Sequence, residues 1–409
     1  MIRFKKNYTL PQLTISEFDY ELPEDKIAKF PLAERDASKL LVYKNNHIRH
    51  QQFYYIDEFL DANYTLFFNN TKVIPARLYF QKETGAAIEV LLLSPLYPSV
   101  VVHVAMQAQG ESIWECTIGN LKRWRENETL QGEFADEQTH LTVKATLRNK
   151  EKKIVHFSWQ PTTLTFAEVL GKIGDLPLPP YLRRETTKED FTTYQTIYGK
   201  KEGAIAAPTA GLHFTERVIE KIRKKGIAMQ ELTLHVSAGT FRPISTSNAA
   251  EHQIHLEQVI ISRQNVEEAL KAKKIAAVGT TSMRTLESLY WYGVKLLLGD
   301  DTFDIDGRLP YQLEPDDLPS RQKSMQTVLD FMQKTAKTEL IGKTGIYIYP
   351  GYVFRMCDAL ITNFHQPKST LILLVAAFVG NAWKDIYREA LEKNYRFLSY
   401  GDSSLLFKD

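Results

Sequence analysis

The sequence predicts an α/β protein whose mixed or mostly parallel sheet is flanked by helices and carries an inserted small antiparallel β-barrel. From about residue 166, helical and strand patterns alternate, which is typical of a sheet with helices on both faces. Residues 78–165 instead contain short alternating apolar runs separated by polar or glycine turns, as in small barrels and sandwiches. At 409 residues the chain is long for one domain. We expect an α/β domain of residues 1–77 and 166–409, with a barrel of residues 78–165.

The first strands follow from short apolar or alternating runs. Residues 64–68 are mostly apolar and aromatic, so we predict a strand there. Alternating residues in the insertion predict several more. These lie at 87–92, 100–104, 140–143 and 153–157.

Helices in the second half are marked by spacing and by end signals. At 215–225, Val218 and Ile222 share one face, Thr215 suits the N-cap and Gly226 suits the end of the helix. Further helices are predicted at 265–273, 282–292 and 369–379, and strands at 229–236, 274–278, 346–349 and 359–362. The acidic and then polar segment 300–343 predicts a surface excursion that ends in a weak helix near 325–334.

Composition excludes several classes of function. The 51 basic and 49 acidic residues nearly cancel, so any nucleic acid must bind through a local basic patch. The two cysteines, Cys116 and Cys357, form neither a metal-type cluster nor a disulfide framework, which fits a reducing cytosol. The N-terminus lacks the apolar core of a signal peptide, and the longest apolar run, 371–379, is about half of a membrane span. We therefore expect a cytoplasmic protein without membrane contact.

The segment 204–215 is the most informative part of the chain. It joins small residues to a helix whose N-cap is Thr215, so that the backbone can approach a ligand beside free N–H groups. Three further loops share this design, at 234–243, 277–288 and 360–370. From the four loops we predict the following substrate-binding residues: Pro208, Thr209, Gly211, His235, Gly239, Thr240, Arg242, Gly279, Thr280, Thr281, Ser282, Arg284, Asn363, Lys368 and Ser369.

The run Gly279-Thr-Thr-Ser282 offers backbone N–H groups and hydroxyls at a helix start, which suits a carboxylate, a phosphate or a ribose. An ordinary turn with a serine cap is the alternative. The run matches neither a phosphate-binding P-loop nor a dinucleotide fingerprint. It therefore gives no support for a nucleoside triphosphate or a dinucleotide.

Histidines adjoin three of these loops, at His213, His235 and His365. One such histidine alone is more often a hydrogen-bonded structural residue, but three at strand-to-loop junctions favour a functional interpretation. The cluster of His252, His255 and Glu257 lacks the spacing of known zinc sites, so we predict no metal.

Two basic clusters contain aromatic residues, which suits RNA through phosphate contact and base stacking, although each could be a solvated turn. The predicted RNA-binding residues are Lys122, Arg123 and Arg125 in the barrel, and Arg183 and Arg184 after a proline-rich run.

With these loops in view, the chain resembles the S-adenosylmethionine:tRNA ribosyltransferase-isomerase family of the queuosine pathway. One matching stretch is Ala206-Ala-Pro-Thr-Ala-Gly-Leu-His-Phe214. Ser237 departs from the family's usual glycine, Ser403-Ser404 replace its more frequent Ala-Met, and 300–343 is longer than is typical. The other matching stretches are 69–77, 175–181, 194–198, 234–243, 251–257, 277–288, 349–352, 361–370 and 397–402.

The resemblance implies that the ribosyl unit of S-adenosylmethionine is transferred to 7-aminomethyl-7-deazaguanine at the wobble position of a tRNA and isomerised, giving epoxyqueuosine, adenine and methionine. It implies no metal or bound organic cofactor, and a monomer. Proton transfer at the ribosyl unit suits imidazoles. We expect His213 and His365 to be catalytic, without assigning base and acid. Residues 279–282 would hold the methionine or ribose end, while Arg242 and Lys368 would position anionic groups.

Two other functions stay open at the level of sequence. An S-adenosylmethionine-dependent RNA methyltransferase predicts a glycine-rich loop after its first strand, and none is visible. A non-catalytic RNA-binding protein needs a basic surface but neither His213 nor the 204–215 loop.

Overall fold

A computed structural model describes residues 2–408 except 136–139, 237–243, 245 and 255. Its larger sheet has parallel pairing at the centre, from β12 through β3 and β14 to β17, and antiparallel pairing near both edges. In spatial order the strands are β15 (Asp304–Ile305), β16 (Glu339–Thr344), β13 (Glu257–Ser262), β12 (Ala228–His235), β3 (Tyr64–Asn69), β14 (Lys274–Val278), β17 (Ala359–Asn363), β18 (Ser403–Phe407), β1 (Lys39–Lys44) and β2 (His47–Gln52).

Helices cover both faces of this sheet because alternate strand residues point to opposite sides. In β3, Phe67 joins one apolar cluster while Leu66 and Phe68 join another. The first cluster is covered by α5 (Arg263–Lys271), α6 (Gly279–Leu297), α8 (Arg321–Lys334), α9 (Thr370–Val379) and α10 (Ala382–Glu392), and the second by α4 (Glu216–Lys224) and the 3-10 segment η4 (Phe53–Phe59). The predicted fold class is confirmed.

The second sheet is antiparallel and nearly closed, because the Phe80 ring of β5 lies against Gly132 of β8. Its core also includes Phe166, Val169 and Leu170 of α2 (Phe166–Ile173), so this helix packs with the barrel. In spatial order the strands are β5 (Arg77–Gln81), β6 (Ala87–Tyr97), β7 (Glu111–Ile118), β10 (Ile154–Gln160), β9 (His140–Asn149) and β8 (Thr129–Ala135).

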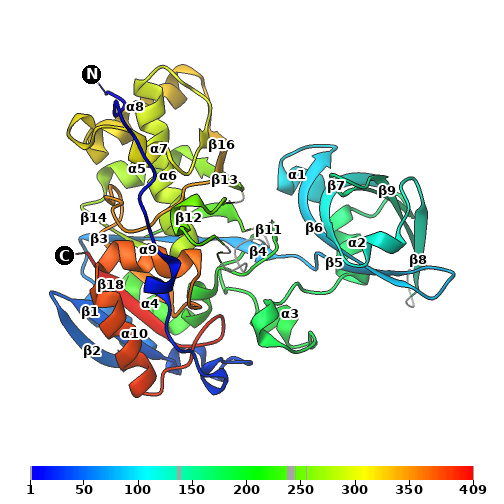
Figure 1. Cartoon of the computed structure of the whole chain (residues 1–409), viewed down its shortest axis with the longest axis horizontal. Helices are drawn as coiled ribbons and strands as arrows, with labels where there is room; N and C mark the ends of the chain where they lie inside the picture. The colour runs from blue at the N-terminus through cyan, green and yellow to red at the C-terminus, as the bar shows by residue number, and fades with distance from the viewer. Residues whose placement is uncertain (1, 136–139, 237–243, 245, 255, 409) are drawn as a thin grey trace.

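Figure 1 shows the barrel set to one side of the larger layer, joined to it by a narrow connection. In that connection Arg77 and Asp175 exchange two backbone hydrogen bonds, of 3.1 and 2.8 Å. The short strands β4 (Thr71–Val73) and β11 (Lys201–Ala204) pair beside it. The helix α1 (Val102–Met106) of the barrel packs against β11, and Gln258 of β13 accepts a hydrogen bond from the Val102 N–H (3.1 Å). The barrel therefore contacts the larger layer through α1 as well as through the two connecting segments.

Three predicted elements differ from the structure. The strand predicted at 100–104 is wrong: α1 forms there, since Val102, Ala105 and Met106 are buried at helical spacing. No strand forms at 346–349, where the backbone N–H groups of Ile346 and Tyr349 donate to side-chain hydroxyls instead. The segment 300–343 contains the predicted helix, α8, but it is more than a surface excursion, because it also supplies β15 and most of β16 to the sheet and buried side chains to the core.

No single helix of the described residues is both long and apolar enough to cross a membrane. The consecutive helices α9 and α10 pass a combined test of length and composition, but they are bent by 114° at their junction.

Candidate active site

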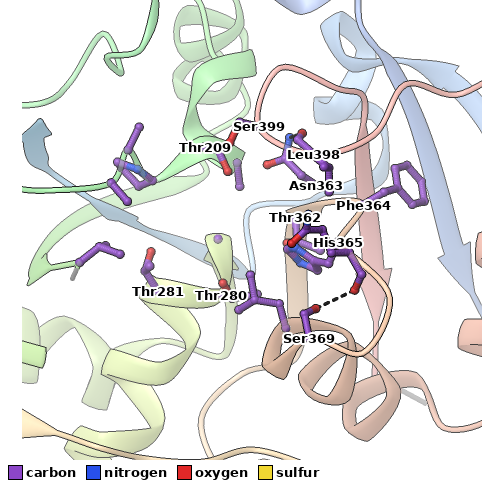
Figure 2. A pocket seen from close by; sticks show the side chains of 18 of the residues that line it. Thr209, Thr280, Thr281, Thr362, Asn363, Phe364, His365, Ser369, Leu398 and Ser399 are labelled. Atoms are coloured by element: carbon purple, nitrogen blue, oxygen red, sulfur yellow. Dashed lines mark hydrogen bonds between the residues drawn. The ribbon is translucent and has the colours of Figure 1, made fainter. Parts of the chain in front are cut away.

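A pocket lies at the carboxyl ends of β12, β14 and β17, which is where parallel sheets place ligands. About 690 Å³ of space lies between its walls, counting the part open to solvent. Figure 2 shows Thr280 and Thr281 on one side and Thr362, Asn363 and His365 on the other. The predicted residues that line it are Pro208, Thr209, Gly279, Thr280, Thr281, Asn363, His365 and Ser369.

The first turn of α6 forms one wall. Gly279 begins this helix with a φ of 89°, a left-handed conformation that glycine adopts without strain. Within the described part of the chain no side chain caps α6, so the positive end of its helix dipole is left to a ligand at this wall. The Thr281 hydroxyl is buried and has no hydrogen-bond partner among the described residues. The alternative of an ordinary turn capped by Ser282 is therefore wrong. Ser282 lies inside α6, and its hydroxyl accepts no hydrogen bond from a helix N–H of the described residues.

His365 lies two residues beyond β17 and lines the opposite wall. Its Nε2 is 2.9 Å from Thr362 Oγ1. Its backbone is fixed on both sides, because its N–H donates to the Tyr387 hydroxyl (3.1 Å) and its carbonyl accepts from the Tyr20 hydroxyl. Burial lowers the pKa of His365 to about 3, so the imidazole is neutral at pH 7.

His213 lies behind the pocket rather than on its lining. It lines a second, smaller pocket together with Arg35 and Arg396. Its Nδ1 is 2.8 Å from Ser38 Oγ, and its Nε2 is 3.1 Å from the amide nitrogen of Asn363. Burial, with a smaller effect of the two arginines, lowers the pKa of His213 to about 3. Both ring nitrogens are thus already engaged within the protein.

Gly211 and His235 are buried but are not among the residues that line the larger pocket. A side chain at Gly211 would place its Cβ 1.9 Å from the Tyr198 hydroxyl, so close packing requires glycine there. Burial, together with the nearby His103, lowers the pKa of His235 to about 4. The prediction that Gly211 and His235 contact the substrate is therefore not supported by the lining of this pocket.

The two predicted cationic side chains that are described have protein partners. Arg284 is buried and donates to the Glu257 carboxylate. Lys368 pairs with Asp19 at 2.6 Å, and this pair is partly exposed. Neither lines the larger pocket. The predicted residues Gly239, Thr240 and Arg242 lie outside the described residues.

The predicted RNA-binding residues fall into two groups. Lys122, Arg123 and Arg125 are exposed on the barrel, whereas Trp124 between them is buried in its core and cannot stack on a base. Arg183 is exposed near Glu24, at 3.3 Å. Arg184 instead forms a buried two-point ion pair, with its two terminal nitrogens 2.6 and 2.7 Å from the carboxylate oxygens of Asp190. Its guanidinium is therefore already occupied.

Over the described ranges, no group of three or more His, Cys, Asp or Glu is placed to hold a metal ion. In the 252–257 cluster Glu257 pairs with Arg284, His252 packs near the Tyr347 ring, and His255 lies outside the described residues.

Tyr181, Thr362, Phe364 and Ser399 also line the pocket and were not predicted as binding residues. The Tyr181 hydroxyl lies 2.5 Å from Ser399 Oγ and so joins two distant loops. Hydroxyl and aromatic residues in loops have no characteristic spacing. Only the family resemblance at 175–181 could have pointed to Tyr181.

Comparison with known proteins identifies the family to which this chain is similar. The family described as "Queuosine biosynthesis protein" matches residues 15–406. Proteins named S-adenosylmethionine:tRNA ribosyltransferase-isomerase from Thermotoga petrophila and Aquifex aeolicus are 38% and 36% identical, over 96% of this chain and 100% of each relative. A crystal structure of S-adenosylmethionine tRNA ribosyltransferase from Thermotoga maritima is 30% identical, with a TM-score of 0.45, over 96% of this chain and 100% of that one.

Proposed function

The chain belongs to the queuosine biosynthesis family, and we propose that it is an S-adenosylmethionine:tRNA ribosyltransferase-isomerase, the activity for which its relatives are named. The ribosyl unit of S-adenosylmethionine is joined to 7-aminomethyl-7-deazaguanine at the wobble position of a tRNA and rearranged to an epoxycyclopentanediol. Adenine and methionine leave, and the tRNA carries epoxyqueuosine. S-adenosylmethionine is a cosubstrate, and no metal or resident organic cofactor takes part.

The observation that carries the proposal is one pocket built by loops far apart in the sequence. Residues 206–210, 279–281 and 362–366 meet there. The uncapped start of α6 supplies N–H groups for the methionine carboxylate, with the Thr281 hydroxyl beside them. The opposite wall, with Asn363 and His365, then faces the nucleoside end.

Proton transfer is assigned to His365 on the pocket wall. The sulfonium acidifies the adjacent 5′ carbon, and a neutral imidazole can accept that proton. Burial keeps the His365 imidazole neutral at pH 7, which is the form that can accept a proton. For His213, the contacts to Ser38 and Asn363 favour a role through Asn363 over direct proton transfer.

The tRNA contact is assigned to the exposed cations of the barrel. Lys122, Arg123 and Arg125 are exposed and can meet phosphates, and the exposed Arg183 can supplement them. The enzyme acts in the cytosol as a monomer in this proposal.

The products of the reaction test the proposal. Purified protein is mixed with a tRNA that carries 7-aminomethyl-7-deazaguanine and with labelled S-adenosylmethionine. We expect adenine and free methionine in equal amounts, and a tRNA heavier by the rearranged ribosyl unit. S-adenosylhomocysteine as the product would identify a methyltransferase. Binding of the tRNA without consumption of the cosubstrate would identify an RNA-binding protein.

A further inference from the structure

The buried amide of Asn363 has one atom that the described part of the chain leaves without a hydrogen bond. Asn363 ends β17, is 2% exposed and lines the pocket. Figure 2 shows it on the side of Leu398 and Ser399, apart from Thr280 and Thr281. Its Oδ1 is buried without a hydrogen-bond partner among the described residues. A buried polar atom without a partner is costly, and in a native protein it calls for a functional explanation.

The orientation of this amide follows from its neighbours. The amide nitrogen lies 3.2 Å from the Leu398 carbonyl oxygen and 3.1 Å from His213 Nε2. A carbonyl oxygen only accepts hydrogen bonds, so the nitrogen of Asn363 must face Leu398. Its other N–H then donates to His213, and Oδ1 is left as an acceptor that no described residue supplies with a donor.

The tautomer of His213 follows from the same contacts. Because Nε2 accepts from Asn363, the ring proton lies on Nδ1 and is donated to Ser38 Oγ at 2.8 Å. The ring is buried and packs against Phe53, with centroids 5.0 Å apart. His213 is therefore a fixed acceptor that holds the Asn363 amide in one orientation.

We infer that Asn363 Oδ1 recognises the exocyclic amino group of the adenine of S-adenosylmethionine, and that His213 is the positioning residue for this contact. The inference rests on the proposed function. The α6 terminus on the other wall takes the carboxylate end, so the purine end lies toward Asn363. The amino group is the only donor on the adenine base of the nucleoside, and Oδ1 can only accept. A purine with an oxo group at position 6 would instead place its oxygen, an acceptor, against the acceptor Oδ1, and no hydrogen bond could form.

Binding by calorimetry tests the inference without turnover. S-adenosylhomocysteine is compared with S-inosylhomocysteine, in which an oxo group replaces the amino group. For the unaltered protein we expect a preference of about 100-fold for the adenine compound, the upper end of the cost of leaving one buried acceptor without its donor. Asn363→Ala should reduce this preference to about 5-fold or less. Equal affinities for the two compounds in the unaltered protein would overturn the inference.

Two substitutions separate positioning by His213 from proton transfer. His213→Ala should lower the preference for the adenine compound by about tenfold, while His213→Gln, which keeps an acceptor near the Nε2 position, should restore most of it. The exposed His47→Ala is the matched control and should change nothing. A residue that acts only in proton transfer leaves the binding preference intact in both His213 variants, and that result would overturn the positioning role. Release of adenine from S-adenosylmethionine by the unaltered protein, measured in parallel, reports on the proposed function alone.

Discussion

Three buried histidines make the stability of the protein depend on pH. Burial lowers the pKa of His213 and His365 to about 3, and that of His235 to about 4, against 6.5 for an ordinary histidine. Between those values the unfolded chain binds protons that the folded protein does not, so stability falls as the pH drops below about 6.5. Each histidine should cost about 2 kcal/mol between pH 7 and pH 5.

Urea denaturation at pH 7 and pH 5 checks this prediction. The midpoint should fall on acidification, and His365→Gln should show a smaller fall than the unaltered protein because one titrating group is removed. Equal midpoints at both pH values would contradict neutral burial of these rings.

For individual residues, the sequence indicated which ones lie at the pocket more reliably than it indicated the role of each. His213 and His365 both stand at loop junctions, but only the packing of Ser38 and Asn363 around the first ring shows that its nitrogens are engaged. Loop sequence does not determine the direction of a side chain, and Ser38 is 175 residues away. The role of His213 could not be predicted for that reason.

Among the elements, capped helices were the most predictable. Thr215 and Ser369 accept hydrogen bonds from the N–H groups of Val218 and Ile372, as expected of N-caps. The short helix α1 was missed because its valines are β-prone, while its burial at helical spacing depends on the barrel around it.

Arg184 and Asp190 form an ion pair that links the loop after η6 (Pro180–Leu182) to the start of α3 (Asp190–Thr193). Arg184→Ala removes the cation that pairs with the buried Asp190 carboxylate, which keeps hydrogen bonds from Thr187 and Tyr400, and should lower the free energy of unfolding by about 3 kcal/mol. It should leave the salt dependence of tRNA binding unchanged. Urea denaturation and filter binding at several salt concentrations measure the two effects.

The exposed cluster should behave in the opposite way. Replacing Lys122, Arg123 and Arg125 together by alanine should lower the slope of log affinity against log salt by about 2 to 3, with an unchanged unfolding midpoint. If the triple variant bound tRNA with the original slope, the barrel turn would not be the phosphate contact.

For the whole molecule, the barrel and the α/β layer could be predicted because their sequence patterns differ. The barrel has short runs that alternate apolar and polar residues, whereas the α/β layer alternates helical and strand patterns. The exact junction was not, since α2 follows the barrel in sequence and its packing partners are known only from the structure. The backbone pair of Arg77 and Asp175 brings the two ends of the insertion together. A deletion can therefore be closed with little strain.

Replacing residues 78–174 by a short glycine linker should leave the α/β layer folded and abolish tRNA binding. Circular dichroism and filter binding check the two expectations. A shortened protein that still modified tRNA would remove the barrel from the proposed function.

The central claim is that loops distant in sequence build one site for a sulfonium nucleoside, and a crystal structure with S-adenosylhomocysteine tests it most directly. We predict the carboxylate at the first turn of α6, near Thr281, and the adenine amino group at Asn363 Oδ1. Density for the nucleoside outside this pocket would contradict the account.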